Sequence, residues 1–164
     1  MSSTALYNNP QELSVELLFK TTTTRGGKLI GFGDSQSGSS GQLDRHVYMT
    51  NSGQLIFGVK PGSWSLVHKV KIFSPLTYND GVWHLVDATL GPDGMALYVD
   101  GIKVGSNATT MAESLNGYWR VGGDSLSGWV SQPSSDYLNG TIDEAAVYGY
   151  ALSPDQVADH QASR

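Results

Sequence analysis

The stretch "NDGVWHLVDATLGPDGMALYVDG", residues 79–101, decides the fold. In a strand over its first part, 82–90, side chains would point alternately to two faces. Both of these faces are largely apolar, which predicts a central strand covered on both sides. The turn signal "GPDG" at 91–94 and the alternation that follows it predict an antiparallel hairpin. Because neighbouring strand residues point to opposite faces, Trp83 and His84 cannot converge on one substrate atom. We interpret this pair as architectural rather than catalytic.

Further strand signals recur on both sides of this hairpin and are separated by glycine-containing turns. They lie at 13–20, 28–33, 45–50, 54–60, 117–123 and 140–148. The one helix signal is "LSPDQVADHQ" at 152–161, in which Ser153 suits an N-cap and Pro154 the first helical position. Since no helical pattern separates the strands, we expect an all-β antiparallel sandwich with a short C-terminal helix, as one domain over 1–164.

Composition excludes several classes of function. The net charge is −5, only 15% of residues are charged, and no run of Lys or Arg offers a basic surface for phosphates. Nucleic acid and anionic membranes are therefore not expected as partners. No apolar run reaches the roughly 18 residues of a membrane span, and "MSSTALYNNP" lacks the charged and apolar regions of a signal peptide. The lack of cysteine excludes disulfides, thiolate catalysis and cysteine zinc sites.

The sequence resembles the laminin G-like, concanavalin A-like jelly-roll domains common on secreted multidomain proteins of actinobacteria. The similar segments include "LSVELLFKTTTTRGGKLIGFGDS", "DGVWH" followed by "ALYVDG", "NGTIDE" and "ALSPDQV". The resemblance implies two stacked antiparallel sheets, with ligands or partner proteins met on the concave face or at rim loops. It also implies that the parent protein is secreted or displayed on the cell surface.

The sequence departs from this family in four places, which fits an engineered or divergent chain. Only twelve residues precede the strand at 13–20, where members have one or two more strands, so we expect an altered N-terminal edge. Leu18 stands where members often have Trp, and the stretch 63–77 is longer and more apolar than expected. Asp87 stands where members have an apolar residue. Because a lone buried carboxylate is costly, Asp87 must be partnered, edge-exposed or a deliberate change.

We expect no catalysis. Glycosidases need two carboxylates facing the scissile bond, and Asp143 and Glu144, as neighbours, face opposite ways. The four histidines, which we place on strand or helix surfaces, have no zinc-type spacing, and no Gly-x-Ser-x-Gly elbow occurs.

Calcium is the candidate cofactor, because the resembled family often binds it and because Asp side chains supply the oxygen ligands that this cation needs. The candidate ligands are Asp124, Asp136 and Asp143. The alternative is that these residues only cap turns.

Exposed aromatic side chains are the candidates for ligand contact, because sugar rings stack on them while polar groups bind the hydroxyls. Trp129 and Tyr137 lie with Asp124 in the long polar segment 124–139, and Trp64 lies in the unusual stretch. For both Trp64 and Trp129 the alternative is ordinary packing, whereas Trp83, Trp119 and Tyr98 are expected in the core. The favoured function is a non-catalytic module that binds carbohydrate at rim loops or the concave sheet.

The alternative function is a protein-interaction or adhesion module. Here the shortened N-terminus, or the strand expected over 63–77, leaves an open edge that pairs with a surface protein or forms a homodimer.

Overall fold

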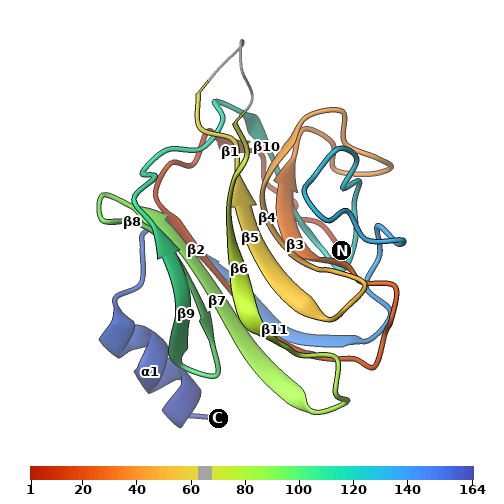
Figure 1. The fold of residues 1–164 in the computed structure, drawn as a ribbon. Coiled ribbons are helices and arrows are strands. Elements are labelled where there is room, and N and C mark those ends of the chain that lie inside the picture. The colour runs from red at the N-terminus through yellow and green to blue at the C-terminus, as the bar shows by residue number, and fades with distance from the viewer. Residues whose placement is uncertain (63–67) are drawn as a thin grey trace.

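The computed structural model describes residues 1–62 and 68–164, which form two stacked antiparallel sheets and one short helix (Figure 1). The six-stranded sheet has the order β1 (Tyr7–Asn8), β10 (Asn116–Val121), β3 (Gly27–Gly33), β4 (Leu43–Met49), β5 (Gln54–Val59), β6 (Val70–Thr77). The five-stranded sheet has the order β11 (Thr141–Tyr148), β2 (Leu13–Lys20), β7 (Trp83–Gly91), β8 (Gly94–Val99), β9 (Ile102–Asn107). This arrangement confirms the predicted all-β, two-sheet jelly roll.

The hairpin that decides the fold lies in the middle of the five-stranded sheet. β7 pairs with β2 on one side and with β8 on the other, and Gly91 and Gly94 close the turn. The central position of β7 is therefore confirmed. The expected burial of Trp83 is wrong, because its side chain is 45% exposed at the start of the strand, whereas His84 is buried.

The main core fills the space between the sheets. Alternate residues of each strand point into it, including Leu13, Val15, Leu17 and Phe19 of β2 and Leu55, Phe57 and Val59 of β5. This inward set follows from the period of two along each strand. Trp119 of β10 also belongs to this core, as expected.

Helix α1 (Pro154–Ala162) packs on the outer face of the five-stranded sheet, beside β8 and β9 (Figure 1). Ser153 and Gln156 form the expected capping box, in which each side chain accepts a hydrogen bond from the other residue's backbone amide. Val157 is the buried residue of the helix and contacts a small cluster with Ala96 and Tyr98. Among the described residues, no helix is long and apolar enough to cross a membrane.

The N-terminal edge is paired rather than open. β1 pairs with β10 through Tyr7 and Gly117, Ser2 bridges to Arg120, and the Tyr7 ring lies edge-on to Trp119 at 6.4 Å. The expectation of a free edge at this end is corrected. β6 is an edge strand, but only over Val70–Thr77, and residues 63–67 of the strand expected there lie outside the described residues.

The long segment 122–140 folds back over the outer face of the six-stranded sheet. The Tyr48 hydroxyl donates to the Val130 carbonyl at 2.6 Å, and Lys28 makes an isolated bridge with Tyr137. Gly58 of β5 allows this close approach, because a Cβ there would lie 2.6 Å from the Trp129 ring. The segment therefore forms an outer layer on the six-stranded sheet.

Candidate functional site

Trp129 is a packing residue. Its side chain is 4% exposed and forms a cluster with Leu43, Tyr48, Ile56 and Leu126. Its ring also lies edge-on to the buried His46 at 4.6 Å. The reading of Trp129 as an exposed stacking platform is therefore corrected in favour of the packing alternative.

His46 was expected on the strand surface, and this expectation is wrong. Its side chain is fully buried beneath the Trp129 ring. Burial, together with the nearby Lys28, Lys60 and Arg45 charges, holds the pKa of His46 well below its usual value. The imidazole is therefore neutral and acts as part of the packing under segment 122–140.

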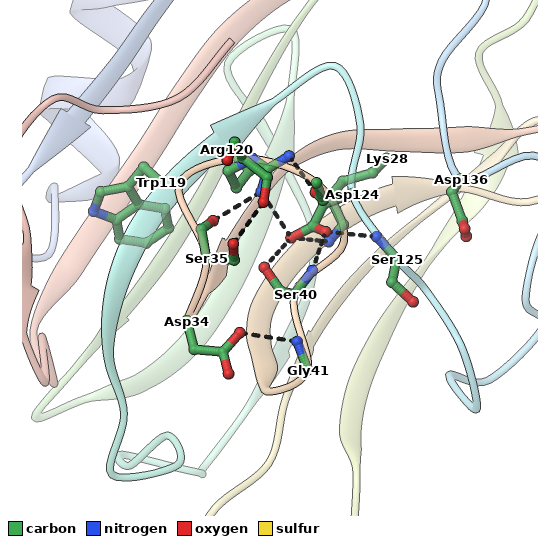
Figure 2. Close-up of polar contacts among 12 residues, drawn as sticks. Lys28, Asp34, Ser35, Ser40, Gly41, Trp119, Arg120, Asp124, Ser125 and Asp136 are labelled. Carbon is green, nitrogen blue, oxygen red and sulfur yellow. Dashed lines mark hydrogen bonds and ion pairs between the residues drawn. The ribbon is translucent and has the colours of Figure 1, made fainter.

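Asp124 is also buried, at 1% exposure, and its carboxylate is saturated with partners (Figure 2). It accepts hydrogen bonds from the Ser40 amide at 3.0 Å, the Ser40 hydroxyl at 2.7 Å and the Ser125 amide at 2.8 Å. Lys28 Nζ lies 3.7 Å and Arg120 Nη1 3.9 Å from the same carboxylate. Asp124 is therefore not free to bind a ligand or a calcium ion.

Asp124 and Lys28 shift each other's pKa values toward the charged forms. Burial works to raise the pKa of Asp124, but the Ser40 hydrogen bonds and the Lys28 ammonium bring it below the usual value. Burial lowers the pKa of Lys28 to about 8, although Asp124 acts in the opposite direction. Both groups are thus charged at neutral pH, and they form a buried ion pair.

The same cluster fixes the serine-rich rim loop 34–42. Arg120 donates to the Ser35 carbonyl at 2.8 Å and to the Gly38 carbonyl at 2.9 Å, while Asp34 closes the loop by accepting from the Gly41 amide (Figure 2). This loop is therefore tied to β10 by charge-assisted hydrogen bonds.

The three proposed calcium ligands do not converge. Asp136 accepts from the Leu126 amide at 3.0 Å, and Asp143 is exposed on β11, where it accepts from the Glu144 amide. In residues 1–62 and 68–164, the only group of three His, Asp or Glu ligand atoms within 4.8 Å of one another is Glu16, Asp87 and His160. The Asp124, Asp136 and Asp143 site is therefore corrected, and the turn-capping alternative describes these residues better.

The two remaining predicted contact residues are Tyr137 and Trp64. Tyr137 is 59% exposed, and its ring lies over Gly123, where a Cβ would overlap it. Trp64 lies outside the described residues.

A cleft of about 420 Å³ opens at the rim beside segment 122–140. Its lining includes Ser40, Lys60, Lys69, Ser125, Ser127 and Trp129. Lys69 Nζ lies 5.4 Å from the centre of the Trp129 ring and donates to the Gly128 carbonyl, and Lys60 pairs with Glu113. Burial and the neighbouring Lys60 charge lower the pKa of Lys69. Sequence reasoning missed both lysines, since they lie in loops without any motif.

The converging group lies on the outer face of the five-stranded sheet. Glu16 and Asp87 are directly opposite in the β2–β7 register, and His160 reaches them from α1, with Nδ1 2.6 Å from Glu16 Oε2. Burial, and then the adjacent Glu16, raise the pKa of Asp87 to about 8. Of the alternatives left open for Asp87, edge exposure is excluded, because its side chain is completely buried.

Two stacked antiparallel sheets with a short C-terminal helix define a jelly-roll domain. The sequence profile of the concanavalin A-like lectin/glucanases superfamily matches residues 2–158, so the chain belongs to this family. No curated protein matches the chain.

Several solved structures share the fold. The heptameric SAP-like pentraxin from Limulus polyphemus is 21% identical, with a TM-score of 0.65 over 96% of this chain and 72% of that one. The IT-sialidase CBM40 of Ruminococcus gnavus is 18% identical, with a TM-score of 0.67 over 94% and 84%. Domains LG4-5 of the mouse laminin alpha1 chain are 20% identical, with a TM-score of 0.59 over 88% and 37%. At these identities the likeness extends to the fold alone.

Proposed function

We propose that this chain is a non-catalytic recognition domain that binds an acidic glycan in the rim cleft. The observation that supports it best is the charge of the cleft. Lys60 and Lys69 both line it, Lys60 beside its ion-pair partner Glu113, although the chain as a whole has a net charge of −5. Ammonium groups bind carboxylates or sulfates of acidic sugars, and the hydroxyls of Ser125 and Ser127 suit sugar hydroxyls.

The size and shape of the cleft agree with this proposal. Its volume of about 420 Å³ lies in the range of small-molecule sites and suits one or two sugar rings. Trp129 forms a fixed wall, and the buried Lys28, Arg120 and Asp124 cluster holds Ser40 and Ser125 in place. A rigid site loses less conformational entropy on binding than a flexible one. The Ruminococcus CBM40, which shares the fold, was also solved bound to alpha2,3-sialyllactose, an acidic sugar.

We propose a non-catalytic function because the described lining of the cleft lacks the pair of carboxylic acids that a glycosidase needs. Among the described residues that line it there is no Asp or Glu, whereas hydrolysis of a glycosidic bond needs two carboxylates across the bond. We place the chain as one domain, 1–164, of a secreted or cell-surface protein whose partners are glycans.

The test is a binding titration with alpha2,3-sialyllactose and, as the neutral comparison, lactose. We expect Lys60→Met and Lys69→Met to weaken sialyllactose binding at least about tenfold, or about 1.4 kcal/mol, and to leave lactose binding nearly unchanged. Lys20→Met is the matched control, since Lys20 is exposed on the other sheet. Equal affinity for the two sugars, or unchanged affinity in both folded cleft variants, contradicts the proposal.

A second function, binding of a protein at a strand edge, is favoured by β6. This strand pairs with β5 alone and exposes Phe73 by 38% and Leu76 by 64%. Light scattering over a range of concentrations tests for a homodimer, with Leu76→Glu as the variant that should abolish it. A monomeric mass at all concentrations argues against this function.

A further inference from the structure

Three chemically reactive side chains from distant parts of the chain meet under helix α1. Glu16 lies on β2, Asp87 on β7 and His160 in the last turns of α1, and one ligand atom of each lies within 4.8 Å of the others. They share the outer face of the five-stranded sheet, away from the rim cleft of the other sheet. Glu16 is 3% exposed and Asp87 is fully buried, so the group is closed off from solvent except on the His160 side.

Asp87 has no partner for either of its carboxylate oxygens. The contrast with Asp124 is informative, because that equally buried carboxylate accepts hydrogen bonds from Ser40 and Ser125 and faces two cations. A buried carboxyl group whose oxygens make no hydrogen bond costs free energy in either protonation state, and a ligand bound there would remove that cost. Both oxygens of Asp87 are thus available to a ligand that the neighbouring Glu16 and His160 also contact.

The donor set determines which ligand fits. Two carboxylates and one imidazole nitrogen match the protein ligands of a zinc-type cation, which takes four ligands at about 2.0–2.2 Å. Calcium requires six to eight oxygens, which this group does not supply. Arg164 holds Glu16 Oε1 at 2.8 Å and leaves Oε2 facing His160 Nδ1, so a cation would replace the hydrogen bond between these two atoms.

We propose that Glu16, Asp87 and His160 form a zinc-type metal site that fastens helix α1 to the five-stranded sheet. Apart from this group, the helix is held by little apolar contact, since Val157 is its one buried residue among those described. A cation bound between the two strands and the helix adds a cross-link in the folded state that the unfolded chain lacks, and it therefore stabilises the fold by linkage.

The test is calorimetric titration of the chelator-treated protein with zinc chloride, together with its melting temperature and hydrogen exchange. We expect one zinc per chain, a higher melting temperature, and slower exchange of amides 154–162 in the presence of zinc. Asp87→Asn and His160→Gln should each weaken zinc binding at least about tenfold. Because the pKa of Asp87 is raised to about 8, the group is uncharged at pH 7, and Asp87→Asn keeps both its size and its charge state, so the fold should survive and the melting temperature without zinc should not fall.

Asp93→Asn and His68→Gln are the matched controls, because both side chains are exposed away from the group. They should bind zinc as the wild type does. The proposal fails if the wild type binds no zinc, or if zinc binding persists unchanged in Asp87→Asn and His160→Gln. It also fails if bound zinc leaves the exchange of 154–162 unaltered.

Discussion

His84 shows how one side chain of the decisive stretch connects two turns. Its Nδ1 lies 2.8 Å from Asp100 Oδ2 and its Nε2 lies 3.2 Å from Asp80 Oδ1. The ring packs between Phe19 and Tyr78 at centre distances of 5.7 and 5.0 Å. Asp100 in turn accepts from the Leu85 amide and adopts a left-handed φ of 53°, as the tight turn before Gly101 requires. The histidine therefore serves the architecture, as predicted, although it is buried rather than on the strand surface.

His84→Phe should lower the free energy of unfolding by about 1–3 kcal/mol, because it removes two hydrogen bonds to charged groups while preserving the ring packing. Urea unfolding measures the change. Asp80→Asn should cost less, since Asp80 is exposed and keeps its contact with the Val82 amide. A His84→Phe variant as stable as the wild type would show that the packing alone holds this hairpin.

Trp129→Ala should lower the free energy of unfolding by about 3–5 kcal/mol, because it opens a cavity against Gly58, His46 and Tyr48. Tyr137→Ala is the comparison in the same segment and should cost under about 1 kcal/mol, since its side chain is mostly exposed. Thermal and urea unfolding of both variants provide the check. Similar losses in the two variants would contradict the assignment of Trp129 to the packing.

The Asp124 ion pair predicts a particular dependence of stability on pH. The pKa of Asp124 is below its usual value in the folded chain, so the unfolded chain binds more protons, and the stabilising contribution is lost as pH falls through the folded pKa. Asp124→Asn should cost about 3–5 kcal/mol at pH 7, since it leaves Lys28 buried without its counter-ion. The difference between variant and wild type should shrink below pH 4, which is measurable by urea unfolding from pH 7 to pH 2. A difference that is constant with pH would show that Asp124 acts by its hydrogen bonds alone.

At the scale of elements, local signals predicted most of the strands and the helix. The 82–90 strand and its hairpin partner were found because apolar alternation and a glycine turn are encoded within a few residues. Helix α1 was found because its capping box is also local. β1 was missed, since Tyr7 and Asn8 are ordered by pairing with β10, more than a hundred residues away.

The N-terminal strand leads to a prediction at this scale. Deleting residues 1–8 should unpair the edge of β10 and uncover Trp119, so the melting temperature should fall and the shortened chain should self-associate. Light scattering over a range of concentrations, combined with thermal unfolding, measures both effects. A shortened chain that stays monomeric and equally stable would show that β1 contributes nothing to the sandwich.

At the scale of the whole molecule, the sequence could not predict which outer faces are covered. His46 and Tyr48 of β4 fall on the outer face, and a period-two reading of the strand places such residues in solvent. Segment 122–140 covers them, and α1 covers Glu16 and Asp87 in the same way. The rim cleft and the group under α1 both arise from these long-range coverings, so neither Lys69 nor His160 could be assigned to a site from residue spacing.

The molecule thus has three separate clusters in successive layers: one under segment 122–140, one between the sheets and one under α1. His84 faces the middle cluster and Trp129 belongs to the first, and none of the contacts described for the two side chains is shared. Changes in the free energy of unfolding caused by substitutions at two sites without common partners add within about 0.5 kcal/mol, provided that the layers unfold together.

The double variant His84→Phe with Trp129→Ala should therefore lose the sum of the two single losses, with one cooperative transition in urea. A coupling energy between the two substitutions above about 1 kcal/mol would mean that a change of packing in one layer alters the other layer through β5. Alternate residues of β5 face the two layers. A second transition would mean that segment 122–140 unfolds on its own, which would also make the wall of the rim cleft a mobile element rather than a rigid one.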